Sequence, residues 1–140
     1  MQIQPYLCFY GRCEEALNFY QQALGAEILF MLRAKDAPGD CAVQGENGER
    51  IMHATLLIGE STVMASDGNA AQEAKPHSGF NVSISVRDLA EGKKIFDALS
   101  QGAQITFPWQ KTFWTEGFGM LTDKFGIPWM VNVEHEESQA

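Results

Sequence analysis

The chain has 140 residues, of which 45% are hydrophobic and 20% are charged, and its formal net charge at pH 7 is −8. This length is enough for one compact domain, or for two small half-domains that share a core. Phosphate groups are bound by basic surfaces, so this acidic chain is not expected to bind nucleic acid or an anionic membrane.

The cysteines and the N-terminal segment indicate the cellular compartment. Cys8, Cys13 and Cys41 have neither the spacing of a disulfide framework nor a Cys-x-x-Cys pair, as expected for reduced thiols. Residues 1–13 lack the basic and apolar regions of a signal peptide, and no apolar run approaches the roughly 18 residues of a membrane span. We therefore expect a cytoplasmic protein.

The first half of the chain is predicted to contain one helix and four strands. From Cys13 onward, Ala16, Phe19 and neighbouring apolar residues recur at helical spacing. Gly25 supplies the left-handed residue that ends this helix. Apolar runs bounded by turn residues predict strands at 3–10, 27–33, 51–58 and 61–66.

Two segments of this half are expected to be irregular. Residues 34–49 are polar and rich in Gly and Asp, and they are too many for a hairpin turn, so we expect a mobile loop that covers a site. Residues 67–78 have the composition of a linker and mark the midpoint of the chain.

The second half begins with a strand at 80–86, in which apolar and polar residues alternate strictly. Asp88 and Glu91 then form a capping box that predicts a helix, with Leu89, Phe96 and Leu99 on its inner stripe and its end at Gly102. Residues 102–133 follow as consecutive antiparallel strands, with a turn at 123–126 and a strand that starts at Pro128.

The two halves form an internal repeat with a spacing of 77 residues. Residues 25–30 match 102–107 at this offset, which also aligns Phe19 with Phe96 and Leu7 with Ile84. Each half is therefore predicted to be a βαβββ unit of one 140-residue domain: unit one at 1–67, the linker at 67–78, unit two at 79–134 and an acidic tail at 135–140. One unit alone leaves a sheet face uncovered, so we expect an α+β fold in which both units form a cupped mixed sheet around a central cavity.

Several motifs resemble those of one protein family. The most specific run is Phe113-Trp114, Gly117-Phe118-Gly119 and Asp123 to Trp129, and weaker motifs are Pro5-Tyr6-Leu7, Glu15-Ala16, Ile51 to Ala54 and Ser66-Asp67. Together with the paired βαβββ units, they resemble the PhnB-like branch of the vicinal oxygen chelate superfamily, which includes glyoxalases, bleomycin resistance proteins and extradiol dioxygenases. The resemblance covers nearly the whole chain, and it implies a glyoxalase-like fold and a homodimer.

The resemblance also implies where metal-using relatives carry their ligands, usually His and Glu, on the first and last strands of each unit. The corresponding positions here are Gln4, Asn81, Met130 and either Met64 or Ser66. Neutral amides and thioethers are poor ligands for the divalent cations of such enzymes. We therefore expect neither a metal nor another cofactor, since a glycine-rich strand-to-helix turn for a nucleotide is also absent.

His53 is the histidine for which a role is most readily predicted. Strand alternation places His53, Thr55 and Leu57 on one face and small and aliphatic residues, which suit packing under a helix, on the other. His53 is therefore expected to face the cavity. A neutral imidazole there would hydrogen-bond a ligand or act as a general base. The alternative is a half-buried histidine satisfied by a neighbouring strand. Cys8 would form a nucleophile with His53 only within hydrogen-bond reach, and a buried inert thiol is the favoured interpretation.

The tryptophans are expected first of all to fill space in the hydrophobic core. Trp129 is expected in the core, whereas Trp114 lies among hydrogen-bonding residues and is expected to line the cavity, to cover the core as a lid, or to form a dimer contact. The complete predicted ligand-binding set is His53, Thr55, Asn81, Ser83, Trp114, Met130 and Asn132.

These observations favour a protein that binds a small, partly aromatic or apolar molecule without a catalytic metal. Two alternatives stay open at this point: a metal-dependent lyase, isomerase or dioxygenase of the same superfamily, and a structural or interaction protein with a filled interior. The sequence assigns no catalytic residue and no reaction.

Overall fold

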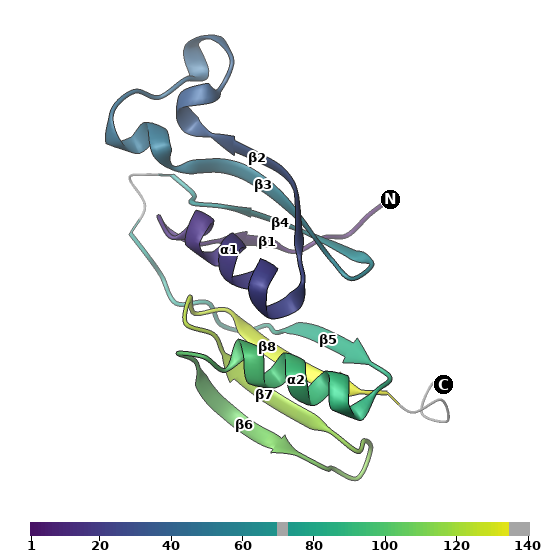
Figure 1. The fold of residues 1–140 in the computed structure, drawn as a ribbon. Helices are drawn as coiled ribbons and strands as arrows, with labels where there is room; N and C mark the ends of the chain where they lie inside the picture. Colours follow the sequence, from purple (N-terminus) through teal and green to yellow (C-terminus); the bar gives the residue numbers. More distant parts are fainter. Residues whose placement is uncertain (70–72, 135–140) are drawn as a thin grey trace. The chain divides into compact units, whose positions relative to one another are not determined.

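The computed structural model describes residues 1–69 and 73–134 (Figure 1). The chain divides into two compact units, Met1–Lys75 and Pro76–Ala140. Unit one contains β1 (Tyr6–Cys8), α1 (Cys13–Leu24), β2 (Glu27–Arg33), β3 (Ile51–Ile58) and β4 (Ser61–Ser66). Unit two contains β5 (Val82–Val86), α2 (Leu89–Leu99), β6 (Gln104–Gln110), β7 (Phe118–Thr122) and β8 (Pro128–Val133). The acidic tail expected at 135–140 lies outside the described residues.

Each unit is a four-stranded mixed sheet with one helix across one face (Figure 1). The strand orders are β1-β4-β3-β2 and β5-β8-β7-β6. In each sheet the first strand of the unit pairs in parallel with the last, and the other pairs are antiparallel. The predicted α+β fold of two βαβββ units is confirmed.

The two sheets also share their register. Tyr6 pairs with Met64 in unit one, as Ser83 pairs with Met130 in unit two. A matching irregularity, between Ile28 and Phe30 and between Ile105 and Phe107, interrupts the pairing of β2 with β3 and of β6 with β7. Up to the ends of β2 and β6, where the two registers differ, the open-face positions of one unit therefore have counterparts in the other.

Helix α1 has the predicted boundaries. It buries Ala16, Leu17, Phe19 and Tyr20, which recur at helical spacing and pack on the sheet. Gly25 follows at φ 66°, and its amide donates to the carbonyl of Gln21 at 3.1 Å. A residue without a Cβ is favoured in this left-handed conformation, so the glycine ends the helix.

Helix α2 begins as predicted but differs from the prediction at its first residue. The Asp88 carboxylate accepts a hydrogen bond from the amide of Glu91 at 2.9 Å, and Phe96 and Leu99 are buried. Leu89, by contrast, is 46% exposed. The prediction that Leu89 belongs to the inner stripe was wrong, because its side chain lies over the backbone at Gly117 in the β6–β7 loop.

The C-terminal end of α2 also differs from the prediction. The helix ends at Leu99, three residues before Gly102. The amide of Ser100 donates to the carbonyls of Phe96 and Asp97, and the Ser100 hydroxyl donates to Asp97 as well, at 2.7 Å. These bonds close the last turn early, and Gly102, at φ 71°, belongs to the turn that leads into β6.

The first strand of each unit is shorter than predicted. Strand β1 covers Tyr6–Cys8 rather than 3–10, because Tyr10 at φ 51° and Gly11 at φ 102° turn the chain toward α1. Strand β5 starts at Val82, whose pairing partner Trp129 follows the proline that opens β8. Asn81, predicted within that strand, is exposed and precedes it.

Each unit contains one buried aspartate. The carboxylate of Asp67 accepts from the amides of Gly11 and Cys13 at 2.8 Å and from the amide of Ile51 at 2.7 Å. Cys13 is the first residue of α1, whose own N-cap residue, Arg12, makes no side-chain cap. Asp67 therefore caps α1 from a distance and ties it to the start of β3.

In unit two, the Asp123 carboxylate accepts from the amides of Phe125 at 2.9 Å and Ile127 at 3.0 Å, and from the Trp129 indole N–H at 2.8 Å. Gly126 completes the turn at φ 87°. The predicted hairpin is confirmed, and Trp129 is buried in the core as predicted.

Candidate functional site

The sheet face of unit one that points away from α1 carries an aromatic and polar cluster, which we call the His53 face: Tyr6, Phe30, His53, Thr55 and Met64. Alternation along β3 buries Ala54 and Leu56 under the helix and leaves His53 and Thr55 half-buried on the other side. Met64 pairs with both Tyr6 and Thr55, so it lies at the centre of this face.

The imidazole of His53 is held by its neighbours. Its Nδ1 lies 3.0 Å from the Tyr6 hydroxyl, and its Nε2 lies 3.4 Å from the Thr55 hydroxyl. The rings of Tyr6 and Phe30 lie 5.6 and 6.0 Å from the His53 ring, centroid to centroid. A neutral imidazole has one donor and one acceptor, and a hydroxyl can serve either, so this arrangement orients the ring for hydrogen bonding to a ligand.

The corresponding face of unit two is more apolar, and we call it the Trp114 face: Ser83, Phe107, Trp114, Phe118, Met120, Met130 and Asn132. The Trp114 indole N–H donates to the Asn132 side-chain oxygen at 3.2 Å. The ring of Phe118 lies 5.2 Å from Trp114 and 5.3 Å from Phe107, edge to face in both cases. The β6–β7 loop thus places an indole over the end of β8.

The structure brings the predicted ligand-binding residues together in two groups. His53 and Thr55 are in contact in unit one, and Trp114 and Asn132 are in contact in unit two. Ser83, Met130 and Asn132 share the Trp114 face, because Ser83 pairs with Met130 and Asn132 lies two residues further on. That all seven residues line one cavity stays a prediction.

Sequence reasoning missed four aromatic members of these faces, Tyr6, Phe30, Phe107 and Phe118. The repeat itself contained the signal for one of them. At an offset of 77 residues, Tyr6 matches Ser83, which was predicted to line the site, whereas Phe30 and Phe107 match only each other. Phe118 was quoted only as part of a motif, and its counterpart by strand pairing is His53.

The positions at which metal-using relatives carry ligands do not fit a divalent cation. The strand pairing makes Met64 the counterpart of Met130, and the Gln4 amide donates to the Thr62 hydroxyl. Within residues 1–69 and 73–134, no group of three His, Cys, Asp or Glu side chains could hold a metal ion. Thioethers and neutral amides supply neither the charge nor the hard donors that such a cation needs.

Cys13 is an inert thiol. It is fully buried as the first residue of α1, and burial raises the pKa of the Cys13 thiol far above its ordinary value, with the nearby Asp67 carboxylate adding to the effect. The thiolate is the nucleophilic form, so Cys13 stays unreactive near neutral pH. The hydrogen bonds of His53 go to Tyr6 and Thr55, and Cys8, for which a buried inert thiol was the favoured interpretation, is half-buried.

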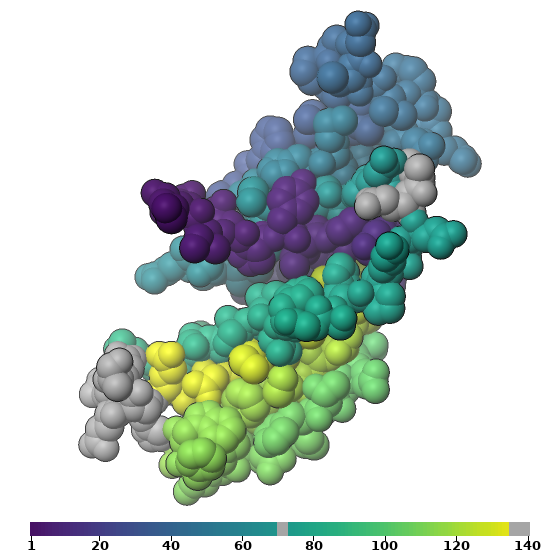
Figure 2. Space-filling model, turned by 180° about the vertical axis from the view of Figure 1, so that it is seen from behind, coloured from purple at the N-terminus to yellow at the C-terminus, as the bar shows by residue number. Residues whose placement is uncertain are grey.

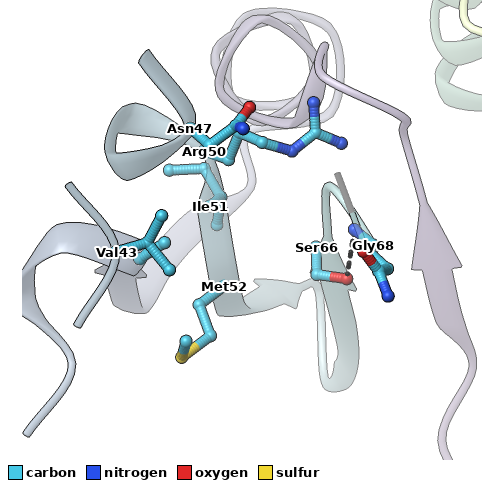
Figure 3. Close-up of a pocket in the computed structure, with 9 residues that line it drawn as sticks. Val43, Asn47, Arg50, Ile51, Met52, Ser66 and Gly68 are labelled. Atoms are coloured by element: carbon cyan, nitrogen blue, oxygen red, sulfur yellow. Dashed lines mark hydrogen bonds between the residues drawn. The ribbon is translucent and has the colours of Figure 1, made fainter. Parts of the chain in front are cut away.

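The loop expected to cover a site does adjoin a pocket. Residues 34–50 form three short 3₁₀ turns, η1 (Ala34–Asp36), η2 (Gly39–Cys41) and η3 (Glu46–Glu49). In Figure 2 this segment, coloured blue, lies at one end of unit one. It encloses a pocket of about 270 Å³ with the start of β3 and the residues after β4 (Figure 3). That the loop is mobile stays a prediction.

The fold and the sequence define the class of this protein. The glyoxalase/bleomycin resistance protein/dioxygenase superfamily matches residues 2–131, and the chain belongs to this superfamily. Its relatives include YjdN of Escherichia coli (strain K12), which is 38% identical over 145 residues covering 98% of each chain.

Two solved structures support the same assignment. Protein PA1353 of Pseudomonas aeruginosa is 40% identical with a TM-score of 0.86, over 96% of this chain and 98% of that one. The PhnB protein of Bacillus cereus is 26% identical with a TM-score of 0.74, over 95% of this chain and 99% of that one. The chain is therefore a PhnB- and YjdN-like member of the superfamily. In the described residues, no helix is long and apolar enough to cross a membrane.

Proposed function

We propose that this protein binds a small, partly aromatic or apolar molecule without a catalytic metal, through the His53 face and the Trp114 face. The observation that carries this proposal is the exposure of large rings beside oriented polar groups. Tyr6, Phe30 and Trp114 are 50%, 49% and 44% exposed. Apolar surface with a few fixed hydrogen-bonding groups is typical of small-molecule sites.

The polar groups give each face a means of orienting a ligand. On the His53 face, the imidazole lies between two hydroxyls, so a ligand hydroxyl or carbonyl can replace Thr55, the more distant partner at 3.4 Å. On the Trp114 face, the Asn132 amide receives the indole N–H and retains its own donors for a ligand. The surrounding rings add stacking of about 0.5–1.5 kcal/mol per aromatic pair.

Thermal-shift screening with aromatic compounds, followed by calorimetric titration of indole and of the strongest hit, tests this proposal. Trp114→Ala is expected to raise the Kd about tenfold, since stacking on an exposed ring of this kind is worth roughly 1.4 kcal/mol. Phe80→Ala is the matched control, because Phe80 is a similarly exposed ring that contacts His77 and belongs to neither face. His53→Leu is expected to weaken only ligands that carry a hydrogen-bonding group.

Two results would contradict the proposal. The first is a broad library without a hit, which would favour a structural or interaction protein. The second is a stoichiometric divalent ion in protein purified without a histidine tag and lost in His53→Leu, which would favour a metal-dependent lyase, isomerase or dioxygenase.

We also infer a homodimer in the cytoplasm. The family resemblance implies the dimer, and large apolar side chains on β2, including Leu29 at 50% exposed, offer area for it to bury. No disulfide joins Cys8, Cys13 and Cys41, as expected in a reducing compartment. Sedimentation equilibrium at micromolar concentration should give twice the mass of 15.5 kDa, and a single-chain mass would contradict the inference.

A further inference from the structure

The pocket beside residues 34–50, which we call the loop pocket, is separate from both faces described above. Its lining includes Val43, Asn47 and Arg50 of the loop, Met52 of β3, Ser66 at the end of β4 and Gly68 after it (Figure 3). At about 270 Å³ it is slightly smaller than the pockets that hold drug-sized ligands, which begin near about 300 Å³. It therefore suits a molecule of modest size.

Arg50 is the unusual member of this lining. One terminal nitrogen, Nη2, donates to the carbonyl of Asp67 at 2.8 Å. Its Nε is buried and has no hydrogen-bond partner among the residues that the structure describes. A buried donor without an acceptor costs about 1–3 kcal/mol, so such a group requires an explanation.

The charge of Arg50 is also unbalanced, in contrast to the neighbouring cations. Arg33 pairs with Glu14, and Lys35 pairs with Glu49 at 2.7 Å. Across residues 1–69 and 73–134, no carboxylate forms an ion pair with Arg50. The carboxylate of Asp67, whose backbone carbonyl Arg50 contacts, already receives three backbone amides. In a chain with a formal net charge of −8, a guanidinium without a carboxylate partner is a local excess of positive charge.

The other walls of the loop pocket are mostly apolar, and their polar groups are Asn47, Ser66 and Asn69. Val43, Ile51 and Met52 contribute aliphatic and thioether surface (Figure 3). The Ser66 hydroxyl oxygen accepts from the amide of Gly68 at 3.1 Å, which leaves the hydroxyl proton available to a ligand acceptor. The pocket thus presents a cation, a hydroxyl donor, two side-chain amides and apolar surface.

We propose that the loop pocket binds a small organic monocarboxylate with a compact apolar body. The carboxylate neutralises Arg50 and gives its Nε–H an acceptor, the Ser66 hydroxyl donates to the same group, and the apolar body lies against Val43 and Met52. A single guanidinium in a mostly apolar pocket suits one negative charge better than a dianion. This site is independent of the proposed function, because it uses none of the residues of the His53 face or the Trp114 face.

Titration of ¹⁵N-labelled protein with benzoate, followed by NMR, tests this inference. Saturable shifts are expected at the amides of Ile51, Met52, Ser66 and Gly68, with a Kd of about 1 mM for so small a ligand. Benzamide, which has the same shape without the charge, should bind at least tenfold more weakly. Shifts confined to the Trp114 indole N–H would report the other site and overturn this proposal, as would the absence of saturable shifts.

Two variants with a matched control complete the experiment. Arg50→Gln should weaken benzoate at least tenfold, whereas Arg87→Gln, which removes an exposed arginine of unit two, should not change the Kd. If Arg50→Gln fails to fold, Val43→Asp adds a carboxylate to the pocket lining without altering Arg50, and it should weaken benzoate to a similar degree. Unchanged benzoate binding in a folded Arg50→Gln or Val43→Asp protein, or equal binding of benzamide, would overturn the proposal.

Discussion

The two units have the same strand order and register but differ in what is attached to the sheet. Seventeen residues, 34–50, connect β2 with β3, whereas seven residues, 111–117, connect β6 with β7. The long connection encloses the loop pocket, and the short one places Trp114 on the open face. The comparison teaches that the sheet is a common framework to which the β2–β3 and β6–β7 connections add different features.

The units also use their buried aspartates differently. Asp67 joins three segments that are distant in sequence, whereas Asp123 organises a single turn and the tryptophan that follows it. Their helix starts differ in the same sense, since α2 is capped by the adjacent Asp88 and α1 by Asp67, 54 residues away from Cys13. Unit one therefore depends more on long-range contacts than unit two.

Removing each aspartate should show the largest effect and sharpen this difference. Asp67→Ala leaves three amides of buried or half-buried backbone without their acceptor. We expect it to lower the free energy of unfolding by about 4 kcal/mol. Asp123→Ala should cost about 2–3 kcal/mol, because the turn amides beside exposed Lys124 can be rehydrated. Both losses are measured as changes in the free energy of unfolding in urea, provided that the m-value of each variant equals that of the wild type. Asp67→Asn, which retains one acceptor oxygen, is the control. The comparison would be contradicted if Asp123→Ala lowered the free energy of unfolding as much as Asp67→Ala, or more.

A smaller effect is expected where the cores differ by one methyl group. The pairing makes Gly119 of β7 the counterpart of Ala54 of β3. A Cβ on Gly119 would lie 2.5 Å from the Phe96 ring, so Gly119→Ala should destabilise by about 2 kcal/mol through overpacking. Ala54→Gly should cost about 1 kcal/mol, by loss of a buried methyl group and greater chain entropy. Combining Gly119→Ala with Phe96→Leu should recover part of the loss, and strict additivity would show that the ring is not the cause.

The smallest effect concerns the charges that hold the long connection. The Lys35 ammonium, hydrogen-bonded to Glu49, lowers the pKa of that carboxyl below its ordinary value of 4.5. A carboxyl with a lowered pKa contributes stability above its ordinary pKa, and that contribution is lost as the pH falls through the lowered value. Backbone chemical shifts of residues 34–50 should therefore stay constant from pH 7 to about 4.5 and change below it.

Glu49→Gln should show the low-pH shifts of the loop already at pH 7, whereas Glu60→Gln, in the β3–β4 hairpin, should leave them unchanged. The corresponding ion pair of the short connection, Lys111 with Glu116, is longer at 3.8 Å, and its removal should have less effect. A Glu49 pKa at or above the ordinary value would contradict the role of Lys35.

Features with a local cause could be predicted from the sequence. The boundaries of α1, the Asp88 cap and the hairpin at 123–126 each depend on residues within a few positions of one another. The repeat predicted both sheets, because strand pairing follows from two copies of one pattern. The errors at Leu89, Gly102 and Asn81 lie at element ends, where capping bonds and the first strand pair compete with periodicity.

The candidate site was predicted in part for the same reason. Alternation placed His53 with Thr55 and Met130 with Asn132, but it does not show which side chains meet across strands. The contacts of His53 with Tyr6 and of Trp114 with Asn132 depend on register and loop path, and the unpaired Arg50 depends on Asp67 being occupied elsewhere. None of these contacts is indicated by a fixed spacing of residues in the sequence.

The base of the long connection has a further consequence. Ala34 and Arg50, its first and last residues, are joined by a backbone hydrogen bond of 2.9 Å, so the segment leaves and re-enters the sheet at one point. Because the entropy of closing a loop changes slowly with its length, this segment can be replaced by a longer or shorter one without straining β2 or β3. The short connection lacks this freedom, since Thr115 and Gly117 are bonded to Val133 in β8. Changes in loop length or sequence, whether among relatives or by protein engineering, should therefore be tolerated in the β2–β3 connection and should destabilise the protein in the β6–β7 connection.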